Sequence, residues 1–462
     1  MEDNPRHKSD GRYSPPRPFR SLFRLRSMED SGSCHRTLMK TYLARWLTLT
    51  LFMVATVAVV NLIVDPYGIF RMAEPPGTNS VKPAAGSRGA MAKAYQVTHV
   101  LPRGLILGNS RMEVGFDPAD PTWPVEARPV YNLALPGTGT STSLRYLRHT
   151  LAALEQAGRP KPRMLVWGVD FIDFLVDADH SPHVMQSDEE SSRLLNNPDG
   201  SLNAARWVKQ VRDYGEATFT LSAFVDSIET LANRENRYAK DLTSLGFNPM
   251  RDYVKITADE GYWGVFHQKD IENIKAFQRR PKSIYEKELH SSGPLRDFQE
   301  IINICRKNNV SLHLMIYPYH AHFLETMRIT GHWSAFEDWK REITRLVYQE
   351  ARHNQSSPFP LWDFSGAHRV SMEKIPEKTN KLYEMKWYWE AGHFKSGLGR
   401  ELLKRMMGHQ GSDRTLGVIL TPENIEEVIS TARLAQQSYL GNPENDVTGL
   451  EKIALDNGFS NP

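Results

Sequence analysis

The residues best suited to chemistry are a serine that follows an apolar run and an acid–histidine pair near the other end of the chain. Residues 104–111 read GLILGNSR, so a short apolar run passes through Gly-Asn into Ser110. Such a run is typical of a buried parallel strand, and Gly-Asn tolerates the positive φ of a sharp turn. A serine placed there lies at the carboxyl end of a central strand, where open α/β sheets bind ligands. The same pattern equally suits Ser110 as a helix N-cap.

A serine hydroxyl becomes a nucleophile when an imidazole accepts its proton and a carboxylate fixes the tautomer of that imidazole. Residues 390–393 read EAGH, and in a helical turn Glu390 and His393 would share one face. We therefore predict a catalytic triad of Ser110, His393 and Glu390, with Gly392 leaving room for substrate. Taken alone, an acid three residues before a histidine is more often part of a surface turn.

The same acid–histidine spacing is used in carboxylate metal sites, which need a second cluster of carboxylates and histidines. The sequence offers only His320 and His322 for such a cluster. Both follow a predicted strand, and we expect them to touch substrate or to shape the rim of the site. We expect no metal and no cofactor; a metal-dependent enzyme built on these two histidines is the least favoured alternative.

The overall composition is that of an ordinary globular protein. The 462 residues are 40% hydrophobic and 24% charged, with a formal net charge of +3. The small positive excess lies near the N-terminus, which gives little support to nucleic-acid binding. There are two cysteines, Cys34 and Cys305. They lie before and after the apolar segment described next, so they imply no disulfide framework.

One segment is apolar enough to cross a membrane. Residues 46–64 carry no charge over 19 residues, and as a helix they would span roughly 28 Å, about one hydrocarbon core. The preceding 45 residues hold ten Lys or Arg and five Asp or Glu, which predicts a cytoplasmic N-terminus and an extracytoplasmic main domain. Asn61 is the one strongly polar residue of the segment, placed near its outer end. We expect a single-pass anchor in a bacterial inner membrane rather than a cleaved signal peptide.

Short apolar runs alternate with helical patterns in the rest of the chain, which is typical of a parallel sheet with helical crossovers. The pattern predicts strands at 104–107, 130–133, 163–169, 310–317 and 361–364, and helices at 141–156, 293–307, 333–351 and 398–407. The stretch 177–282 breaks this rhythm, and we expect it to be an insertion that covers or walls the site. Its aromatic segment 261–266 either stacks on sugar rings or, as the more common arrangement, packs beneath the insertion.

These features predict five parts along the chain. They are a disordered basic tail (1–45), a transmembrane helix (46–64), a Pro/Gly-rich linker (65–98), an α/β domain (99–408) with the insertion at about 177–282, and a polar helical C-terminal tail (409–462).

In combination, the motifs resemble those of the SGNH (GDSL-like) hydrolase and acyltransferase superfamily. The likeness is strongest to its membrane-anchored extracytoplasmic branch, which includes DltD-like and alginate-acetylation-like proteins. The motifs that match are the nucleophile turn at 108–110, Asn132 followed by Gly137, and Glu390 with His393. The resemblance covers roughly residues 100–177 and 285–407. It implies a three-layer, flavodoxin-like α/β fold with a parallel sheet.

The resemblance also implies how a developing oxyanion is bound. The amides of Ser110 and Gly137 would form the hole, and we expect substrate contacts from Asn109, Arg111 and Asn132. The family's third block is Gly-x-Asn-Asp, whose Asn side chain donates to the oxyanion, whereas residues 168–171 read GVDF.

Asp170 therefore stands where that donor is expected. When ionised it would repel the developing charge, so it helps only if it is protonated, or if it faces away and orients another donor such as Arg111. Losing one donor typically costs a factor of ~10²–10³ in rate.

The function implied by the resemblance is acyl transfer, most naturally of acetyl, to or from an envelope or secreted polysaccharide. An acyltransferase would need a donor delivered by a multi-pass membrane partner, whereas an esterase would pass the acyl group to water. The competing hypothesis is an inactive SGNH-like subunit that binds glycans or acts as a scaffold, and Asp170 favours it. Loss of activity as His393 becomes protonated on acidification would favour the enzyme.

Overall fold

The computed structural model describes residues 29–70, 77–177, 191–287, 290–366, 368–442, 445 and 447–459. The chain divides into two compact units, Met1–Thr56 and Val57–Pro462, and the sheet lies within the second. The first long helix, α1, runs from Glu29 to Val64, and its His35–Val64 part is long and apolar enough to cross a membrane. The expected disordered tail falls partly outside the described residues, while residues 29–45 are helical.

The second unit is built on a six-stranded sheet in the order β2-β1-β3-β4-β5-β8. The first five strands are parallel, and β8 pairs antiparallel with β5. The order 2-1-3-4-5 of the parallel strands is that of flavodoxin-like sheets. The predicted α/β class with a parallel sheet is confirmed. The strands are β1 Gly104–Leu107, β2 Val130–Asn132, β3 Met164–Val169, β4 Ser311–Ile316, β5 Leu361–Asp363 and β8 Val418–Ile419.

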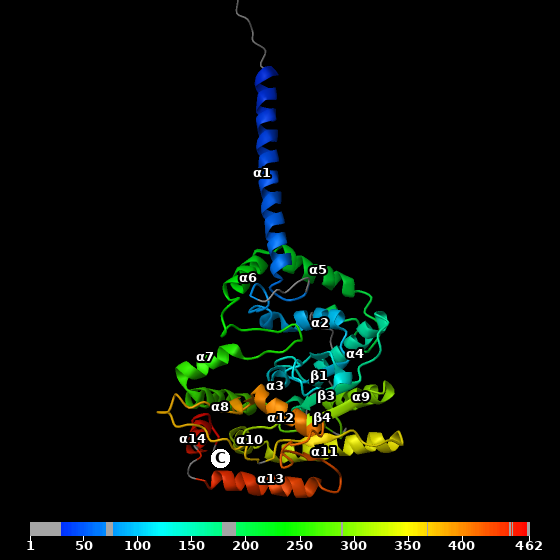
Figure 1. Cartoon of the computed structure of the whole chain (residues 1–462), viewed down its shortest axis with the longest axis vertical. Helices are drawn as coiled ribbons and strands as arrows, with labels where there is room; N and C mark the ends of the chain where they lie inside the picture. Colours follow the sequence, from blue (N-terminus) through cyan, green and yellow to red (C-terminus); the bar gives the residue numbers. More distant parts are fainter. Residues whose placement is uncertain are drawn as a thin grey trace, which may run out of the picture. The chain divides into compact units, whose positions relative to one another are not determined.

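Helices cover both faces of this sheet, and β1, β2 and β3 are therefore buried along their whole length. Neighbouring residues of β3 show the two faces: Trp167 packs on Phe298 of α9 (Gly293–Lys307), whereas Gly168 faces Met112 of α3 (Ser110–Gly115). Contacts link α2, α4, α9 and α11 in series, and α3 contacts α12 (Figure 1). These helices are α2 Gly89–Val100, α3 Ser110–Gly115, α4 Thr140–Gln156, α9 Gly293–Lys307, α11 Trp333–His353 and α12 Ser396–Met406.

The segment 65–98 was expected to be a linker, but much of it belongs to the fold. It contains most of α2, and Lys82 is buried, with Nζ donating to the carbonyls of Val64 and Asp65 at 3.2 and 2.8 Å. Lys93 of α2 is also buried and pairs with Glu113 at 2.8 Å. Proline and glycine mark turns, but the burial of these lysines depends on partners that are distant in sequence.

The insertion divides into two helical pairs. The first is α5 (Arg206–Phe219) with α6 (Leu221–Ala232), and the second is α7 (Arg251–Glu260) with α8 (Tyr262–Gln278). Helix α8 contacts β6 (Tyr388–Glu390), the first strand of a two-stranded hairpin. Tyr253 of α7 meets Trp389 of this strand edge-on, with the ring centres 6.1 Å apart. Part of the insertion therefore walls the region of residues 388–390.

The segment 409–462 was expected to be a polar tail, yet it completes the sheet. Strand β8 pairs with β5, and the Leu420 N–H donates to the Leu361 carbonyl at 2.8 Å. Leu416, Ile425 and Ile429 join the main hydrophobic core. The remaining elements include α10 Ala321–Ile329, α13 Ile425–Leu440, α14 Val447–Asp456, and the hairpin strands β6 Tyr388–Glu390 and β7 His393–Phe394.

Candidate active site

Ser110 lies at the point where β1 gives way to α3. Gly108 has a φ of +138°, and a Cβ there would lie 2.6 Å from both Met112 Cγ and the Tyr317 hydroxyl oxygen. Asn109 then caps the helix, since its side chain accepts from the Arg111 N–H at 3.2 Å. Ser110 is the first residue of α3 rather than its cap. The turn therefore presents the serine at the carboxyl end of β1.

Glu390 and His393 are opposite partners in a two-stranded antiparallel hairpin, in which Ala391 and Gly392 connect β6 to β7. The conditional expectation of a helical turn is therefore not met, but the hairpin also places the two side chains together. Nδ1 of His393 is hydrogen-bonded to a Glu390 carboxylate oxygen. With the proton on Nδ1, Nε2 accepts from the Ser110 hydroxyl at 2.7 Å.

The carboxylate of this group is buried, and its partners keep it ionised. Burial alone would raise the pKa of Glu390. Close approach of His393, a 2.7 Å hydrogen bond from the Gly392 N–H, and the Arg111 charge together lower it to about 2. The His393 side chain is 27% exposed, whereas that of Glu390 is 2% exposed. The imidazole thus faces solvent on one side and a permanent negative charge on the other.

Gly392 leaves room for Arg111 rather than for substrate. A Cβ at this position would lie 3.2 Å from an Arg111 Nη atom and 3.4 Å from both Glu390 carboxylate oxygens. The Arg111 Nε–H donates to the Gly392 carbonyl at 2.7 Å. The guanidinium of Arg111 therefore supports the hairpin that carries Glu390 and His393.

Arg111 is buried beneath the site, so the expected direct substrate contact does not fit its position. It is 6% exposed and forms an ion pair with Asp170. Its guanidinium also lies over three aromatic rings, 4.8 Å from that of Phe323, 5.4 Å from that of Tyr319 and 5.7 Å from that of Tyr317. The residue acts as a support that joins α3, β3 and the β6–β7 hairpin.

Asp170 follows β3 and is fully engaged by neighbouring side chains. One carboxylate oxygen accepts from Arg111 and from the Asn109 amide at 2.7 Å, and the other accepts from the Tyr319 hydroxyl at 2.7 Å. Asp170 does face Arg111, as one of the alternatives had it, but Arg111 is buried against Asp170 and the Gly392 carbonyl and is not presented as a donor to an oxyanion. The carboxylate is not placed as an oxyanion donor.

A second carboxyl group beside Asp170 was not anticipated. Asp173 accepts from the same Asn109 amide at 3.2 Å. Burial, followed by the neighbouring charge of Asp170, raises its pKa well above the ordinary value. The three-residue spacing from Asp170 was the available signal, because the short helical turn Phe171–Phe174 returns Asp173 toward Asn109. Asn109 thus bonds two neighbouring carboxyl groups through one amide nitrogen.

The two backbone amides implied by the resemblance lie at the start of a helix and in an exposed turn. Ser110 begins α3, so its N–H has no acceptor within its own helix. Gly137 has a φ of +70°, and a Cβ there would meet no atom within 4 Å. Both amides stay candidates for the oxyanion hole.

Three other expected substrate contacts lie in the interior. The Asn132 amide donates to the carbonyls of Met112 and Phe116 at 2.9 and 3.0 Å, so it holds the end of α3. Nε2 of His320 bonds the Glu373 carbonyl at 2.8 Å, and burial, with the nearby His322, lowers its pKa to about 3. His322 is also buried, and its Nδ1 is hydrogen-bonded to an Asp270 carboxylate oxygen at 3.0 Å. Direct contact with a polymer substrate does not fit these positions.

The aromatic segment 261–266 mostly follows the packing alternative. Tyr262 and Phe266 are buried, and Phe266 meets the ring of His320 edge-on at 5.2 Å. Trp263 is half-buried and stacks on His267 at 4.8 Å. Within the described ranges, no group of three or more His, Cys, Asp or Glu side chains is arranged to hold a metal ion.

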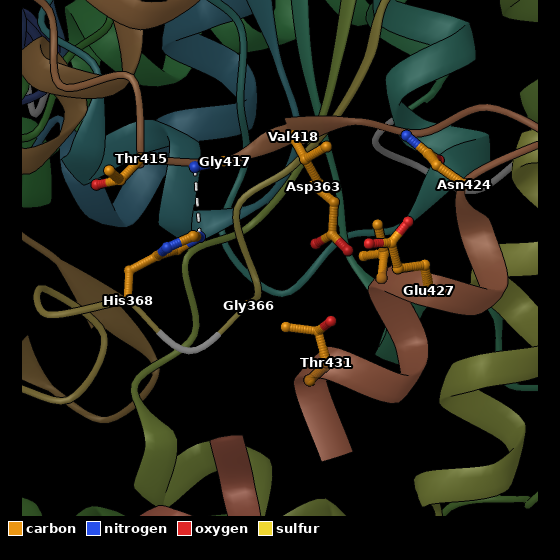
Figure 2. A pocket seen from close by; sticks show the side chains of 11 residues that line it. Asp363, Gly366, His368, Thr415, Gly417, Val418, Asn424, Glu427 and Thr431 are labelled. Atoms are coloured by element: carbon orange, nitrogen blue, oxygen red, sulfur yellow. Dashed lines mark hydrogen bonds between the residues drawn. The ribbon is translucent and has the colours of Figure 1, made fainter. Parts of the chain in front are cut away.

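A cavity of about 310 Å³ lies elsewhere, where β5 ends against β8 and α13 (Figure 2). Asp363, His368 and Glu427 contribute to its lining. Asp363 is already paired with the buried Lys340 at 2.8 Å, and His368 accepts from the Gly417 N–H at 3.3 Å. The cavity contains no member of the Ser110 cluster, so we do not assign it to the candidate active site.

The local geometry thus supports nucleophilic chemistry at Ser110, whereas comparison with known proteins adds nothing to it. No protein-family model matches the chain, and no curated protein matches it.

Proposed function

We propose that the chain is a membrane-anchored, SGNH-type serine esterase or O-acyltransferase, most naturally an O-acetyltransferase. The observation that carries the proposal is the continuous hydrogen-bonded row from the Ser110 hydroxyl through His393 to Glu390. These are the groups that activate a serine in acyl transfer. The row joins elements 283 residues apart in the sequence.

In the proposed reaction, His393 takes the hydroxyl proton as Ser110 attacks the acyl carbonyl of the donor. Glu390 stabilises the resulting imidazolium, and the amides of Ser110 and Gly137 bind the oxyanion. His393 then protonates the departing donor alcohol, which leaves the acyl group on Ser110. A sugar hydroxyl or water next attacks this ester and loses its proton to His393, which passes the proton to the departing Ser110 oxygen, so that the free serine and neutral imidazole are regenerated.

The proposed acceptor is an envelope or secreted polysaccharide. The apolar helix α1 supports a location at a membrane, and the basic N-terminus favours a cytoplasmic start with the second unit outside. A multi-pass partner would bring the acyl donor through the membrane, and α1 would keep Ser110 in reach of that partner.

The proposal is tested by treating the full chain in detergent with a fluorophosphonate probe and locating the adduct by mass spectrometry. We expect an adduct on Ser110 that disappears in His393→Ala. His409→Ala is the matched control, since the His409 side chain bonds the backbone carbonyl of Thr122 at 3.2 Å and contacts no residue of the proposed triad among the described contacts. Absence of an adduct from a folded wild-type chain would contradict the enzyme.

An inactive glycan-binding or scaffold subunit is the second candidate. It is favoured by Asp170, which is occupied by Arg111 and Tyr319 and so supplies no side-chain donor at the expected place. Retained glycan binding by a chain whose Ser110 stays unlabelled would support this alternative.

A further inference from the structure

Two helices of the insertion expose an unusual amount of apolar surface. On α5 and α6, Trp207 is 65% exposed and Leu221 is 70% exposed. Others exposed on the same two helices are Val208, Val211, Phe219, Val225, Ile228 and Leu231. An apolar patch gathered on neighbouring elements marks an interaction surface, unlike single exposed apolar residues.

The exposed residues lie on one side of each helix. Trp207, Val211 and Phe219 are spaced four and eight apart on α5, and Leu221, Val225 and Ile228 are spaced four and three apart on α6. This spacing produces an apolar stripe. Most buried residues of the same helices, Asp213, Ala217, Ala223, Ser227 and Thr230, lie on other faces, whereas Thr218 is buried at the end of α5 where Asn61 contacts it. We call the exposed stripe of α5 and α6 the hairpin face.

The hairpin is attached to the last turns of the apolar helix α1 (Figure 1). The Asn61 amide donates to the carbonyl of Thr218 in the last turn of α5 at 3.0 Å and to that of Thr220, which connects α5 to α6, at 3.3 Å. The Ser227 hydroxyl donates to the Asn61 side-chain oxygen at 3.0 Å. These contacts satisfy the one strongly polar residue of the apolar segment, and they hold the hairpin where that segment ends.

Charged side chains beside α5 favour a lipid over an apolar protein partner. A polar cavity of about 350 Å³ is lined by Arg88, Arg193, Lys209 and Arg212 together with Asp213 and Glu216. Asp213 pairs with both Arg193 and Lys209, and Glu216 pairs with Arg212. The four cations still exceed the two carboxylates, and this net positive charge complements anionic headgroups. Trp207 supplies the kind of amphipathic ring that gathers at membrane–water boundaries.

We propose that the hairpin face binds the surface of the lipid bilayer that α1 crosses, with its apolar side chains at the boundary between headgroups and acyl chains. This inference rests on the proposed membrane anchor, but not on catalysis by Ser110. An amphipathic helical surface of this composition is suited to lie in the interface plane. The hairpin adds a second membrane contact to the spanning helix.

The experiment uses the full chain with Cys34→Ser, reconstituted into vesicles of phosphatidylcholine and phosphatidylglycerol at roughly three to one. Cys305 is buried and stays in place. Single cysteines at Val211 or Val225 carry a nitroxide label, whose collisions with oxygen and with a water-soluble nickel chelate report depth. The matched control is Leu434→Cys on α13, which replaces an equally exposed apolar residue, and Val54→Cys tests α1 itself.

We expect labels at 211, 225 and 54 to collide several-fold more with oxygen than with nickel, and the label at 434 to show the reverse. A lipid-exposed label at 54 with aqueous labels at 211 and 225 would overturn the inference and leave the anchor intact. Aqueous labels at all positions would overturn both. Spin–spin broadening at 211 that vanishes on dilution with unlabelled chain would overturn the inference, because it would show that the hairpin face contacts a second copy of the chain and not the bilayer. Fluorophosphonate labelling of Ser110 in the same samples reports the catalytic proposal separately.

Discussion

Ser110 depends for its proposed reactivity on groups that the chain supplies from a distant hairpin. His393 accepts the hydroxyl proton, and Glu390 holds the imidazole from the other side. The carboxylate can perform this task over a wide pH range, because its pKa is lowered to about 2. Arg111 supports the same hairpin through the Gly392 carbonyl.

Glu390→Gln tests this arrangement. The amide keeps the size of the side chain but removes the charge that stabilises the imidazolium. We expect fluorophosphonate labelling of Ser110 to slow by about 10³–10⁴-fold, as in related triads. Glu384→Gln is the control, since that carboxylate is 82% exposed. A labelling rate for Glu390→Gln equal to that of the control would contradict the proposed role.

Asp170→Asn tests the support beneath the site. The substitution would make the position match the resembled family, but it leaves the Arg111 charge buried without its carboxylate. We expect a loss of about 3–5 kcal/mol in the free energy of unfolding, measured by thermal unfolding in detergent. Asp173→Asn is the control and should cost little, because burial and the neighbouring charge of Asp170 raise the pKa of Asp173, and the neutral amide still fits beside Asn109. In Arg111→Met/Asp170→Asn the combined cost should fall below the sum of the single costs.

At the scale of elements, α3 and β3 approach each other so closely that only glycine fits between them. A Cβ at Gly168 would lie 2.4 Å from Tyr317 Cε1 and 2.5 Å from Met112 Cγ. This contact places Ser110, which begins α3, in a set position relative to Asp170, which follows β3. The site is therefore positioned by packing between a helix and a strand as well as by its hydrogen bonds.

We expect Gly168→Ala to destabilise the chain by about 1–3 kcal/mol through overpacking, and to slow labelling of Ser110 because α3 must shift. Gly397→Ala on α12 is the control. That position is open to solvent, and a Cβ there meets no atom within 4 Å. The control should gain up to about 1 kcal/mol from helix propensity. Equal unfolding temperatures for the two variants would show that the contact between α3 and β3 accommodates the added methyl group, which would contradict the predicted overpacking.

At the scale of the whole molecule, buried neutral histidines link the fold to pH. His149 accepts from the Leu195 N–H at 2.9 Å and bonds the Ala94 carbonyl at 2.7 Å, and burial lowers its pKa from 6.5 to about 4. His320 is bonded in the same way and has a pKa of about 3. Each imidazole uses one nitrogen as an acceptor, so protonation would remove a hydrogen bond and charge the core.

We expect the free energy of unfolding to fall as pH drops from about 6.5 toward 4, because the unfolded chain then binds protons that the folded chain excludes. Each of the two histidines contributes about 1.4 kcal/mol per pH unit over this interval. Glu390 acts only at lower pH: its stabilisation is complete above its ordinary value of 4.5 and is lost as pH falls toward 2. Unfolding midpoints at about pH 7 and pH 5 measure the slope. His149→Gln should reduce this slope. An unchanged slope would show that His149 does not contribute to the pH dependence of the free energy of unfolding.

The sequence by itself determined the elements whose signals are local. Apolar runs predicted β1, β3 and β4 closely, and helix patterns predicted α4, α9 and α11. The order of the chemical motifs also brought Ser110, Glu390 and His393 to attention. Such features depend on neighbours a few residues away, so they can be predicted without knowledge of the tertiary structure.

The tertiary structure decided which distant groups meet. It buried Lys82 and Lys93 in a segment that resembled a linker, and it paired β8 of the expected tail with β5. It also turned Asp170 toward Arg111. The physical reason is common to these cases. The partner that makes a buried charge or an added strand favourable is far away in sequence, and its identity is set only when the sheet, its covering helices and the β6–β7 hairpin pack together.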